Sequence, residues 1–317
     1  MWPFDQRSAR RRRAAAGVVV VGVLATALLR GSFATANAKE LGQYDWTAAA
    51  VAIQAPTAVA TPAPVATPAP VPSTPAPPEP RATFDLAAEL ASAVAAVAAD
   101  TGTTLGVALL AAGSDPASLV TAGTWVSGRA WSTVKVPIAI AALAAGGSDA
   151  AAVRAITESD NDAARQLWDS IGAAEQAATA AEAVLRAGGD TKTVIERNPF
   201  GHTEWDLAAQ AGFAAHFPTG AAADRVWDLM GQIDASQSWG LGRFAEAHFK
   251  GGWSPDQGGY VVRQFGQAPI AGGCVALAVG VTAPSFASGT GALDQLAEAL
   301  AGLAEHLPAG PCRAGDE

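Results

Sequence analysis

The chain has 317 residues, half of them apolar, and a formal net charge of −9, which allows one large domain or two small ones. Five arginines fall within the first thirteen residues, so the remainder is more acidic than the total indicates, which argues against a protein that binds nucleic acid by neutralising phosphates. The four histidines are dispersed and the two cysteines form no CxxC pair, so we predict no metal site and no cofactor.

A basic segment and then an apolar segment begin the chain, in the order typical of an export signal. Residues 1–13 hold the arginines and should stay in the cytoplasm by the positive-inside rule, and residues 14–29 form the apolar run. The run is short for a membrane-spanning helix, and Ala36-Asn37-Ala38 offers a cleavage site. We expect either a signal anchor with one pass through the cell membrane and the domain outside, or secretion after cleavage near Ala38. The run Arg10 to Arg13 disfavours a buried core helix.

Residues 30–82 are expected to form a linker rich in proline, alanine and threonine. Within it, Val59-Ala-Thr-Pro-Ala-Pro64 is repeated at once as Val65-Ala-Thr-Pro-Ala-Pro70. Such a sequence cannot bury a core and favours an extended polyproline conformation. We interpret it as a passive tether between the membrane and a folded domain.

The folded domain is predicted to span residues 83–313, followed by a short tail, 314–317. Its hydrophobic pattern alternates between strand and helix periods, with a long helical stretch in the middle and a turn at Gln257-Gly-Gly. Two strands, a helical block, three strands and flanking helices indicate an α+β fold, in which a five-stranded antiparallel sheet is flanked by helices and joined to an all-helical subdomain. The expected elements are helix 85–99, strands 103–111 and 119–125, helical block 132–229, strands 246–253, 260–265 and 274–281, and helix 289–306.

The two cysteines, Cys274 and Cys312, are far apart in the sequence. An exported domain would most simply pair them as a disulfide. Two unpaired thiols are the alternative.

Ser132-Thr-Val-Lys135 is the first segment that carries chemistry. A serine and a lysine at i and i+3 share one helix face, and at a helix N-terminus the serine meets unpaired backbone N–H groups. A serine hydroxyl is a weak nucleophile that needs a base within hydrogen-bond reach. Lys135 can be that base if burial and a nearby positive charge, such as Lys250, lower its pKa.

Two further motifs follow in chain order, Ser159-Asp160-Asn161 and Lys250-Gly251-Gly252. S-x-x-K, S-D-N and K-T-G in this order form the signature of class A β-lactamases and penicillin-binding proteins. Residues 155–172 and 239–266 also resemble the corresponding segments of that family. The chain is therefore similar to the β-lactamase/transpeptidase-like serine hydrolases over about residues 83–306, and the fold of that family is expected.

The resemblance implies a role for each motif residue. Ser132 would attack a carbonyl and form an acyl-enzyme, and Lys135 would take its proton. Ser159 would relay the proton to the leaving nitrogen, Asn161 would hold Lys135 and a substrate amide, and Lys250 would supply positive charge. The plainer alternatives are a helix N-cap for Ser132, a capping pair at Ser159 and Asp160, and an edge-strand charge for Lys250.

Substrate binding would involve the strand that follows Lys250. The backbone N–H groups of Ser132 and Trp253 would form the oxyanion hole. Gly251 and Gly252 would line the substrate, and Arg263 could bind a substrate carboxylate unless it is only a surface cation.

Three departures from the family pattern restrict the expected activity. The separation between Ser132 and Ser159 is shorter than in class A β-lactamases, so helices between them should be missing or reduced. Gly251 lacks the hydroxyl that usually binds the substrate carboxylate. Glu196 and Arg197 match a structural acid–arginine pair, which puts Pro199 at the position of the water-activating glutamate; Glu196 or Glu204 are the possible substitutes.

Taken together, the sequence predicts an extracytoplasmic acyl-serine hydrolase, either a peptidase, amidase or esterase or a penicillin-binding type. Its substrate would be a cell-wall peptide or a small amide or ester. A catalytically silent binding or scaffold domain of the same fold is the alternative. A true class A β-lactamase is a third reading, disfavoured by Pro199.

Overall fold

The chain divides into two compact units, Met1–Arg81 and Ala82–Glu317. The structure, a computed structural model, describes residues 84–313, which belong to the second unit. The predicted basic segment, apolar run, linker and tail all lie outside these residues. Between residues 84 and 313, no helix has the length and apolar character that a membrane span requires.

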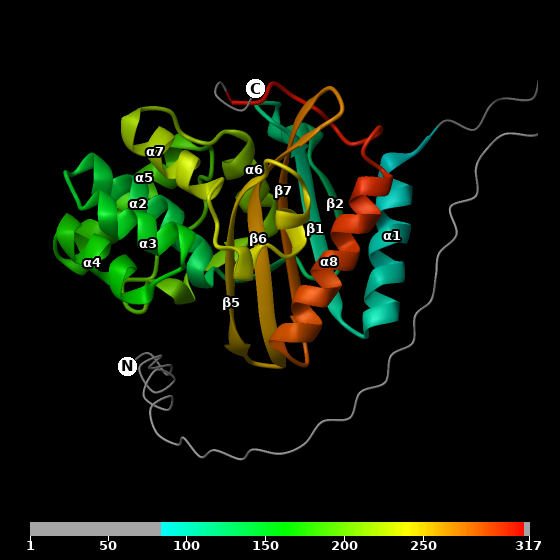
Figure 1. The fold of residues 1–317 in the computed structure, drawn as a ribbon, viewed down its shortest axis with the longest axis horizontal. Coiled ribbons are helices and arrows are strands. Elements are labelled where there is room, and N and C mark those ends of the chain that lie inside the picture. Colours follow the sequence, from blue (N-terminus) through cyan, green and yellow to red (C-terminus); the bar gives the residue numbers. More distant parts are fainter. Residues whose placement is uncertain (1–83, 314–317) are drawn as a thin grey trace, which may run out of the picture. The chain divides into compact units, whose positions relative to one another are not determined.

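A five-stranded antiparallel sheet forms the centre of the described unit (Figure 1). Its strand order, β2-β1-β7-β6-β5, brings the first two strands and the last three into one sheet. This arrangement confirms the predicted α+β architecture. The strands are β1 Thr104–Ala111, β2 Val120–Gly123, β5 His248–Asp256, β6 Gly259–Ile270 and β7 Gly273–Ala283.

Helices cover both faces of the sheet. On one face lie α1 (Leu86–Thr101) and α8 (Phe286–Gly302), and on the other lies α6 (Leu207–Ala215). In β1 every residue after Thr104 is buried, as expected of a strand covered on both faces. The helix predicted from residue 85 starts one residue later because Asp85 is its N-cap, accepting from Ala88 N at 3.2 Å.

The helical block between the two groups of strands packs around one buried helix. All residues of α2 (Lys135–Ala144) from Val136 to Ala142 are buried. The surrounding helices contribute many alanines, whose small side chains let helices approach closely. These helices are α3 Asp149–Thr157, α4 Asn161–Ile171, α5 Ala174–Ala187 and α7 Ala221–Met230.

A small second sheet was not predicted. It pairs β3 (Ser127–Arg129) with β4 (Glu204–Asp206), and three residues per strand give too short an alternation to recognise in a sequence. Short 3₁₀ helices also interrupt the chain, at Pro116–Ser118, Trp131–Val134 (η3), Phe200–His202 (η4), Ala235–Gln237 and Gly240–Arg243.

One row of residues across the sheet has almost no side chains. The paired positions, from β2 to β5, are Gly123, Gly106, Gly280, Arg263 and Gly252. A Cβ at Gly280 would lie 2.1 Å from the ring of Trp125, and one at Gly252 would lie 2.8 Å from the backbone N of Ser132. The glycines therefore let the segment from Trp125 to Ser132 lie directly on the sheet.

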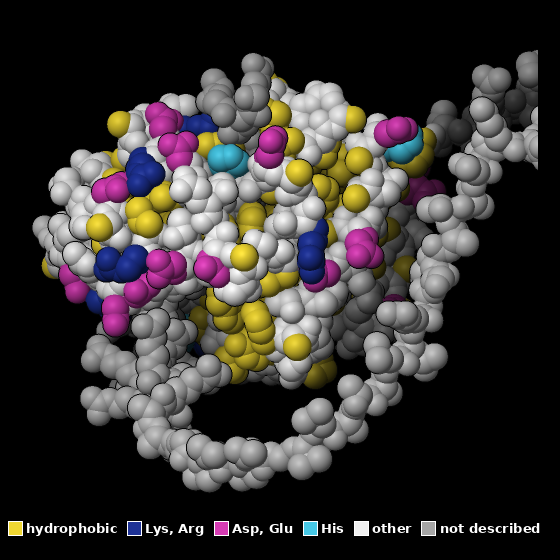
Figure 2. Space-filling view, viewed as in Figure 1, with side chains coloured by type: hydrophobic (Ala, Val, Ile, Leu, Met, Phe, Trp, Pro, Cys, Tyr) yellow, Lys and Arg dark blue, Asp and Glu magenta, His cyan; other side chains and the backbone are white. Residues whose placement is uncertain are grey.

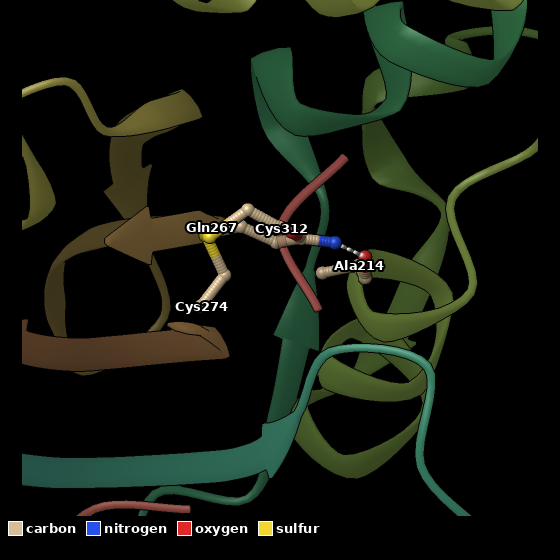
Figure 3. Close-up of a disulfide and its surroundings, with 4 residues drawn as sticks. All are labelled: Ala214, Gln267, Cys274 and Cys312. Carbon is tan, nitrogen blue, oxygen red and sulfur yellow. Dashed lines mark hydrogen bonds between the residues drawn. A yellow bond between two sulfur atoms is a disulfide. The ribbon is translucent and has the colours of Figure 1, made fainter. Parts of the chain in front are cut away.

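The C-terminal segment is attached to the sheet by a disulfide between Cys274 and Cys312, as predicted (Figure 3). Backbone hydrogen bonds between Cys274 and Gly310, of 2.8 and 3.0 Å, support the same attachment. The bridge closes a loop with a sequence separation of 38, for which the chain-entropy estimate is a stabilisation of about 4 kcal/mol. Nearby, Gln267 Nε2 donates to Ala214 O at 2.7 Å and ties β6 to α6.

Candidate active site

Ser132 lies at the start of a helix that is packed against the sheet. It is the second residue of η3, which runs directly into α2 at Lys135, so its backbone N–H has no acceptor within the helix. Its side chain is partly exposed and Oγ makes no hydrogen bond to any residue between 84 and 313. The preceding Trp131 has φ 49°, a strained conformation for a bulky residue, of the kind that occurs at functional sites.

Lys135 is a buried amine, with 1% of the residue exposed. Its Nζ donates to the backbone O of Ser159 at 2.6 Å and to Oδ1 of Asn161 at 2.7 Å. A longer contact of 3.5 Å joins it to Ser159 Oγ. Lys135 therefore connects the helix that begins beside Ser132 to the Ser159-Asp160-Asn161 turn.

Lys250 approaches the same turn from the sheet. It lies on β5, is completely buried, and donates to Ser159 Oγ at 3.1 Å and to Gly251 O at 3.0 Å. Its Nζ also lies 5.9 Å from the ring centroid of Trp253, a cation–π distance. Two amines from different elements thus meet at one serine hydroxyl.

The surroundings of the two lysines favour their neutral forms. Burial, and after it the charge of Lys250, lowers the pKa of Lys135 well below its ordinary value, and Asp160 opposes this only in part. Burial also lowers the pKa of Lys250, to about 7. A neutral amine can accept a proton near neutral pH, which a fully exposed lysine cannot do.

In the Ser159-Asp160-Asn161 turn, Asp160 caps a helix while the other two residues bond Lys135. Asp160 caps α4, since its Oδ1 accepts from the backbone N of Asp162 at 2.8 Å and of Ala163 at 2.9 Å. Ser159 has φ 58°, and this conformation accompanies a side chain that meets the two amines. The capping alternative therefore holds for Asp160, whereas Ser159 and Asn161 turn toward Lys135.

Strand β5 brings the expected oxyanion-hole residues near one another. Gly252 lies so close to η3 that a Cβ would come 2.7 Å from Ala130 O and 2.8 Å from Ser132 N. Trp253 follows Gly252 on this strand. The backbone of β5 next to Trp253 is therefore adjacent to the N–H of Ser132.

Arg263 corrects an expectation from the sequence. It is fully buried, and Nη1 donates to Gly128 O at 2.7 Å while Nη2 donates to Trp205 O at 2.9 Å and to Gln210 Oε1 at 2.7 Å. These bonds leave no terminal nitrogen for a substrate carboxylate. Arg263 is a core residue that holds β3 and β4 over the sheet.

The same network reaches the turn that contains Ser132. Gln210 Nε2 donates to Thr133 Oγ1 at 3.1 Å, and Thr133 Oγ1 donates to Ala130 O at 2.6 Å. All three side chains, those of Arg263, Gln210 and Thr133, are completely buried. They fix the backbone on either side of Ser132, and no sequence motif marked Gln210 or Thr133.

The glutamates considered as substitutes for the missing base do not join this cluster. Glu196 is exposed, and Glu204, also exposed, accepts from Ser127 at 2.6 Å. Arg197, which matched the arginine of the family's loop, binds Glu175 at 2.8 Å and Glu182 at 3.3 Å, both on α5. Its bonds anchor the loop to that helix.

Two residues near the site were not identified in advance. The imidazole of His202, on η4, contacts the ring of Trp131 edge to face with centroids 5.4 Å apart. Burial and then the charge of Arg129 lower its pKa. Trp239 lies beside Gly251.

Within the described part of the chain, no cluster of His, Cys, Asp or Glu could hold a metal ion.

The fold is shared with known serine enzymes. A β-lactamase from Burkholderia vietnamiensis aligns with a TM-score of 0.57 and 19% identity, over 68% of this chain and 97% of that one. A β-lactamase from Sphaerobacter thermophilus aligns with a TM-score of 0.54 and 20% identity, over 70% of this chain and 98% of that one. A variant of PBP-A, in an acyl-enzyme complex with penicillin G, aligns with a TM-score of 0.54 and 20% identity, over 70% of this chain and 98% of that one.

No protein-family model and no curated protein matches the sequence. At about 20% identity the structural similarity establishes the fold. It confirms that the chain has the fold of class A β-lactamases and penicillin-binding serine hydrolases, as the three motifs indicated.

Proposed function

We propose that this chain is an acyl-serine hydrolase with Ser132 as its nucleophile. The observation that carries the proposal is the meeting of two buried amines at Ser159, with Lys135 Nζ at 3.5 Å and Lys250 Nζ at 3.1 Å from its hydroxyl oxygen. Burying two amines without carboxylate partners is costly. A purely structural role does not explain why two amines are buried in this way, whereas proton transfer requires amines of lowered pKa.

The reaction would proceed in two acyl-transfer steps. Neutral Lys135 accepts the proton of Ser132 Oγ as that oxygen bonds to the substrate carbonyl carbon. The negative charge on the carbonyl oxygen is stabilised by the N–H groups of Ser132 and Trp253. Ser159 passes a proton to the leaving nitrogen or oxygen, the bond to the leaving group breaks, and an acyl-enzyme remains. Water then attacks the ester, releases the acid and returns the proton to Ser132.

The second step is expected to be slow. Neither Glu196 nor Glu204 is bonded to the motif residues, and both are exposed. Without a carboxylate base close to the ester, general-base assistance worth about 10²- to 10⁴-fold is missing. We therefore propose a peptidase, amidase, esterase or penicillin-binding activity, and not efficient β-lactam hydrolysis.

Incubation of the purified chain with a fluorescent penicillin and with a fluorophosphonate, followed by intact mass over time, tests this function. A stable adduct that maps to Ser132 and is absent in Ser132→Ala is expected. Rapid turnover of the penicillin would instead indicate a β-lactamase. Failure of both probes to label Ser132 would support the silent binding domain, for which the glycine at position 251 is the observation in favour.

We also propose that the enzyme acts outside the cytoplasm, held by the N-terminal segment or secreted. The arginines before residues 14–29 support this, and so does the Cys274–Cys312 disulfide, because disulfides persist mainly in oxidising compartments. A cell-wall peptide or a small amide or ester would then be within reach. Fractionation of cells that express the full chain tests the location, and recovery in the cytosolic fraction would contradict it.

A further inference from the structure

The region beside Gly251 has an aromatic lining where the related enzymes keep a hydroxyl. A Cβ at Gly251 would lie 3.3 Å from Cη2 and Cζ2 of Trp239 and 3.5 Å from Cζ3 of Trp253. The two indole rings meet edge to face, with centroids 6.0 Å apart. Glycine at this position therefore leaves room for two indoles to close around the strand.

The aromatic lining continues away from Gly251. Phe286, at the start of α8, lies 5.6 Å from Trp253 and 5.9 Å from Tyr260, ring centroid to centroid. Trp253, Tyr260 and Phe286 are each partly exposed, so the rings form surface as well as core. In Figure 2, hydrophobic side chains gather over the lower part of β5.

This aromatic surface adjoins the chemical centre. The ring centroid of Trp253 lies 5.9 Å from Nζ of Lys250, which in turn donates to Ser159. In the proposed mechanism Ser159 protonates the leaving group. The aromatic surface is therefore on the leaving-group side of the scissile bond.

Each cation discussed near the aromatic surface already has a hydrogen-bond or ion-pair partner among the described residues. Arg263 is buried in its backbone network, and Lys250 is fully buried and bonded to Gly251 O and Ser159. Arg243 forms an ion pair with Asp294 at 2.5 Å, and Arg129 lies 3.3 Å from Asp256. A substrate carboxylate placed here would lose water without gaining a positive partner, which is strongly unfavourable.

We propose that the leaving-group side of this site binds an uncharged, apolar group against the partly exposed ring of Trp253, which packs on the buried Trp239. The substrates are then esters or amides that carry no free carboxylate next to the scissile bond. This inference rests on the proposed function, because it takes Ser132 and Ser159 as the reacting centre. It departs from carboxylate-bearing substrates, for which a hydroxyl at position 251 would be required.

Two synthetic esters with the same acyl group test the inference: phenyl phenylacetate and its 3-carboxyphenyl counterpart. Their binding is measured by tryptophan fluorescence on Ser132→Ala, which cannot be acylated. The neutral ester should bind at least about tenfold more tightly, as expected when a carboxylate is desolvated without a partner. Equal affinity, or tighter binding of the carboxylated ester, would overturn the inference.

A charge-adding variant sharpens the test. Trp253→Arg in the Ser132→Ala background should reduce the preference for the neutral ester about tenfold or reverse it, because it supplies the missing cation. Ala301→Arg, at the exposed far end of α8, is the matched control and should leave the preference unchanged. A preference that Trp253→Arg and Ala301→Arg alter equally would overturn the assignment to this surface.

The outcome for the proposed function is read separately on the wild-type chain. If Ser132→Ala prefers the neutral ester but the wild-type chain is acylated by neither ester nor by the fluorophosphonate, the hydrolase proposal fails and the apolar binding site stands. If the wild-type chain is acylated by both esters and the binding preference is absent, the hydrolase stands and the apolar site fails.

Discussion

Lys135 and Lys250 approach the same hydroxyl from opposite elements, one from the buried helix α2 and the other from the edge strand β5. Their Nζ atoms lie 3.5 and 3.1 Å from Ser159 Oγ. Among residues 84–313 no carboxylate bonds either amine; their acceptors are the oxygens of Ser159, Asn161 and Gly251. Both amines are therefore bonded only to uncharged oxygens, so no carboxylate among these partners stabilises their charged forms.

Replacing Lys135 with alanine should lower the rate of Ser132 labelling by about 10²- to 10⁴-fold, the usual value of a general base. In the wild-type chain the rate should rise with pH and level off well below pH 10.5, because burial and Lys250 lower the pKa of Lys135. Stopped-flow labelling with an uncharged fluorophosphonate measures both. Lys192→Ala, at an exposed lysine, is the control, and a rate that still climbs at pH 10.5 would exclude Lys135 as the base.

The free energy of unfolding should rise with pH from about 7 to about 9.5. An amine whose pKa is lower in the folded chain binds fewer protons there than in the unfolded chain, so unfolding takes up protons in this range. With the pKa of Lys250 at about 7 against an ordinary 10.5, one proton gives a slope of up to about 1.4 kcal/mol per pH unit. Urea titrations across this range should show the slope, and Lys250→Met should reduce it. An unchanged slope in Lys250→Met would contradict the assignment.

Replacing Arg263 with methionine should destabilise the protein by about 3 kcal/mol or more, because Gly128 O, Trp205 O and Gln210 lose their buried donor. Thermal unfolding measures the effect, and Arg154→Met, at a partly exposed ion pair with Asp160, should change stability by less than about 1 kcal/mol. If Arg263→Met were stable and impaired only with carboxylate-bearing ligands, Arg263 would be a binding residue after all.

The neighbouring glycines of β5 should respond differently to alanine. Gly252→Ala would push a methyl group to 2.7 Å from Ala130 O, a backbone atom, and should slow labelling of Ser132 by about 10²-fold, since a displacement of about 1 Å can cost that much. Gly251→Ala meets the ring of Trp239, at 3.3 Å, and that of Trp253, at 3.5 Å, and should cost less than about tenfold. The rates of Ser132 labelling in the two variants test this difference. An equal decrease in both rates would contradict the close approach of Gly252 to the backbone beside Ser132.

The sequence predicted the large elements because their hydrophobic patterns are long and regular. The three closing strands and α1 were placed within a few residues, and the disulfide was paired correctly. The final helix was expected at residue 289 but begins at Phe286, where Ser285 caps it. Since Ser285 and Ser288 make the cap reciprocally, the start depended on side-chain hydrogen bonds that hydrophobic periodicity does not report.

The motifs predicted which residues carry chemistry, and the structure brings Ser159, Asn161, Lys135 and Lys250 together. The role of Arg263 could not be inferred in the same way. A lone arginine on a strand is compatible with a ligand contact or with a buried network, and the difference lies in β3 and β4, which are too short to predict. The position of His202 likewise depends on tertiary packing of a segment without a recognisable pattern.

The row of four glycines and Arg263 that crosses the sheet makes the position of Ser132 depend on how the strands are aligned. Its members come from residues 106, 123, 252, 263 and 280, and they meet only when all four strand pairs have the observed register. A slip of one residue in any pair would turn a larger side chain toward the segment that carries Ser132. A chain misfolded in this way would keep its helices and strands, and would pass a test of secondary structure, yet Ser132 would be displaced from Lys135 and Ser159.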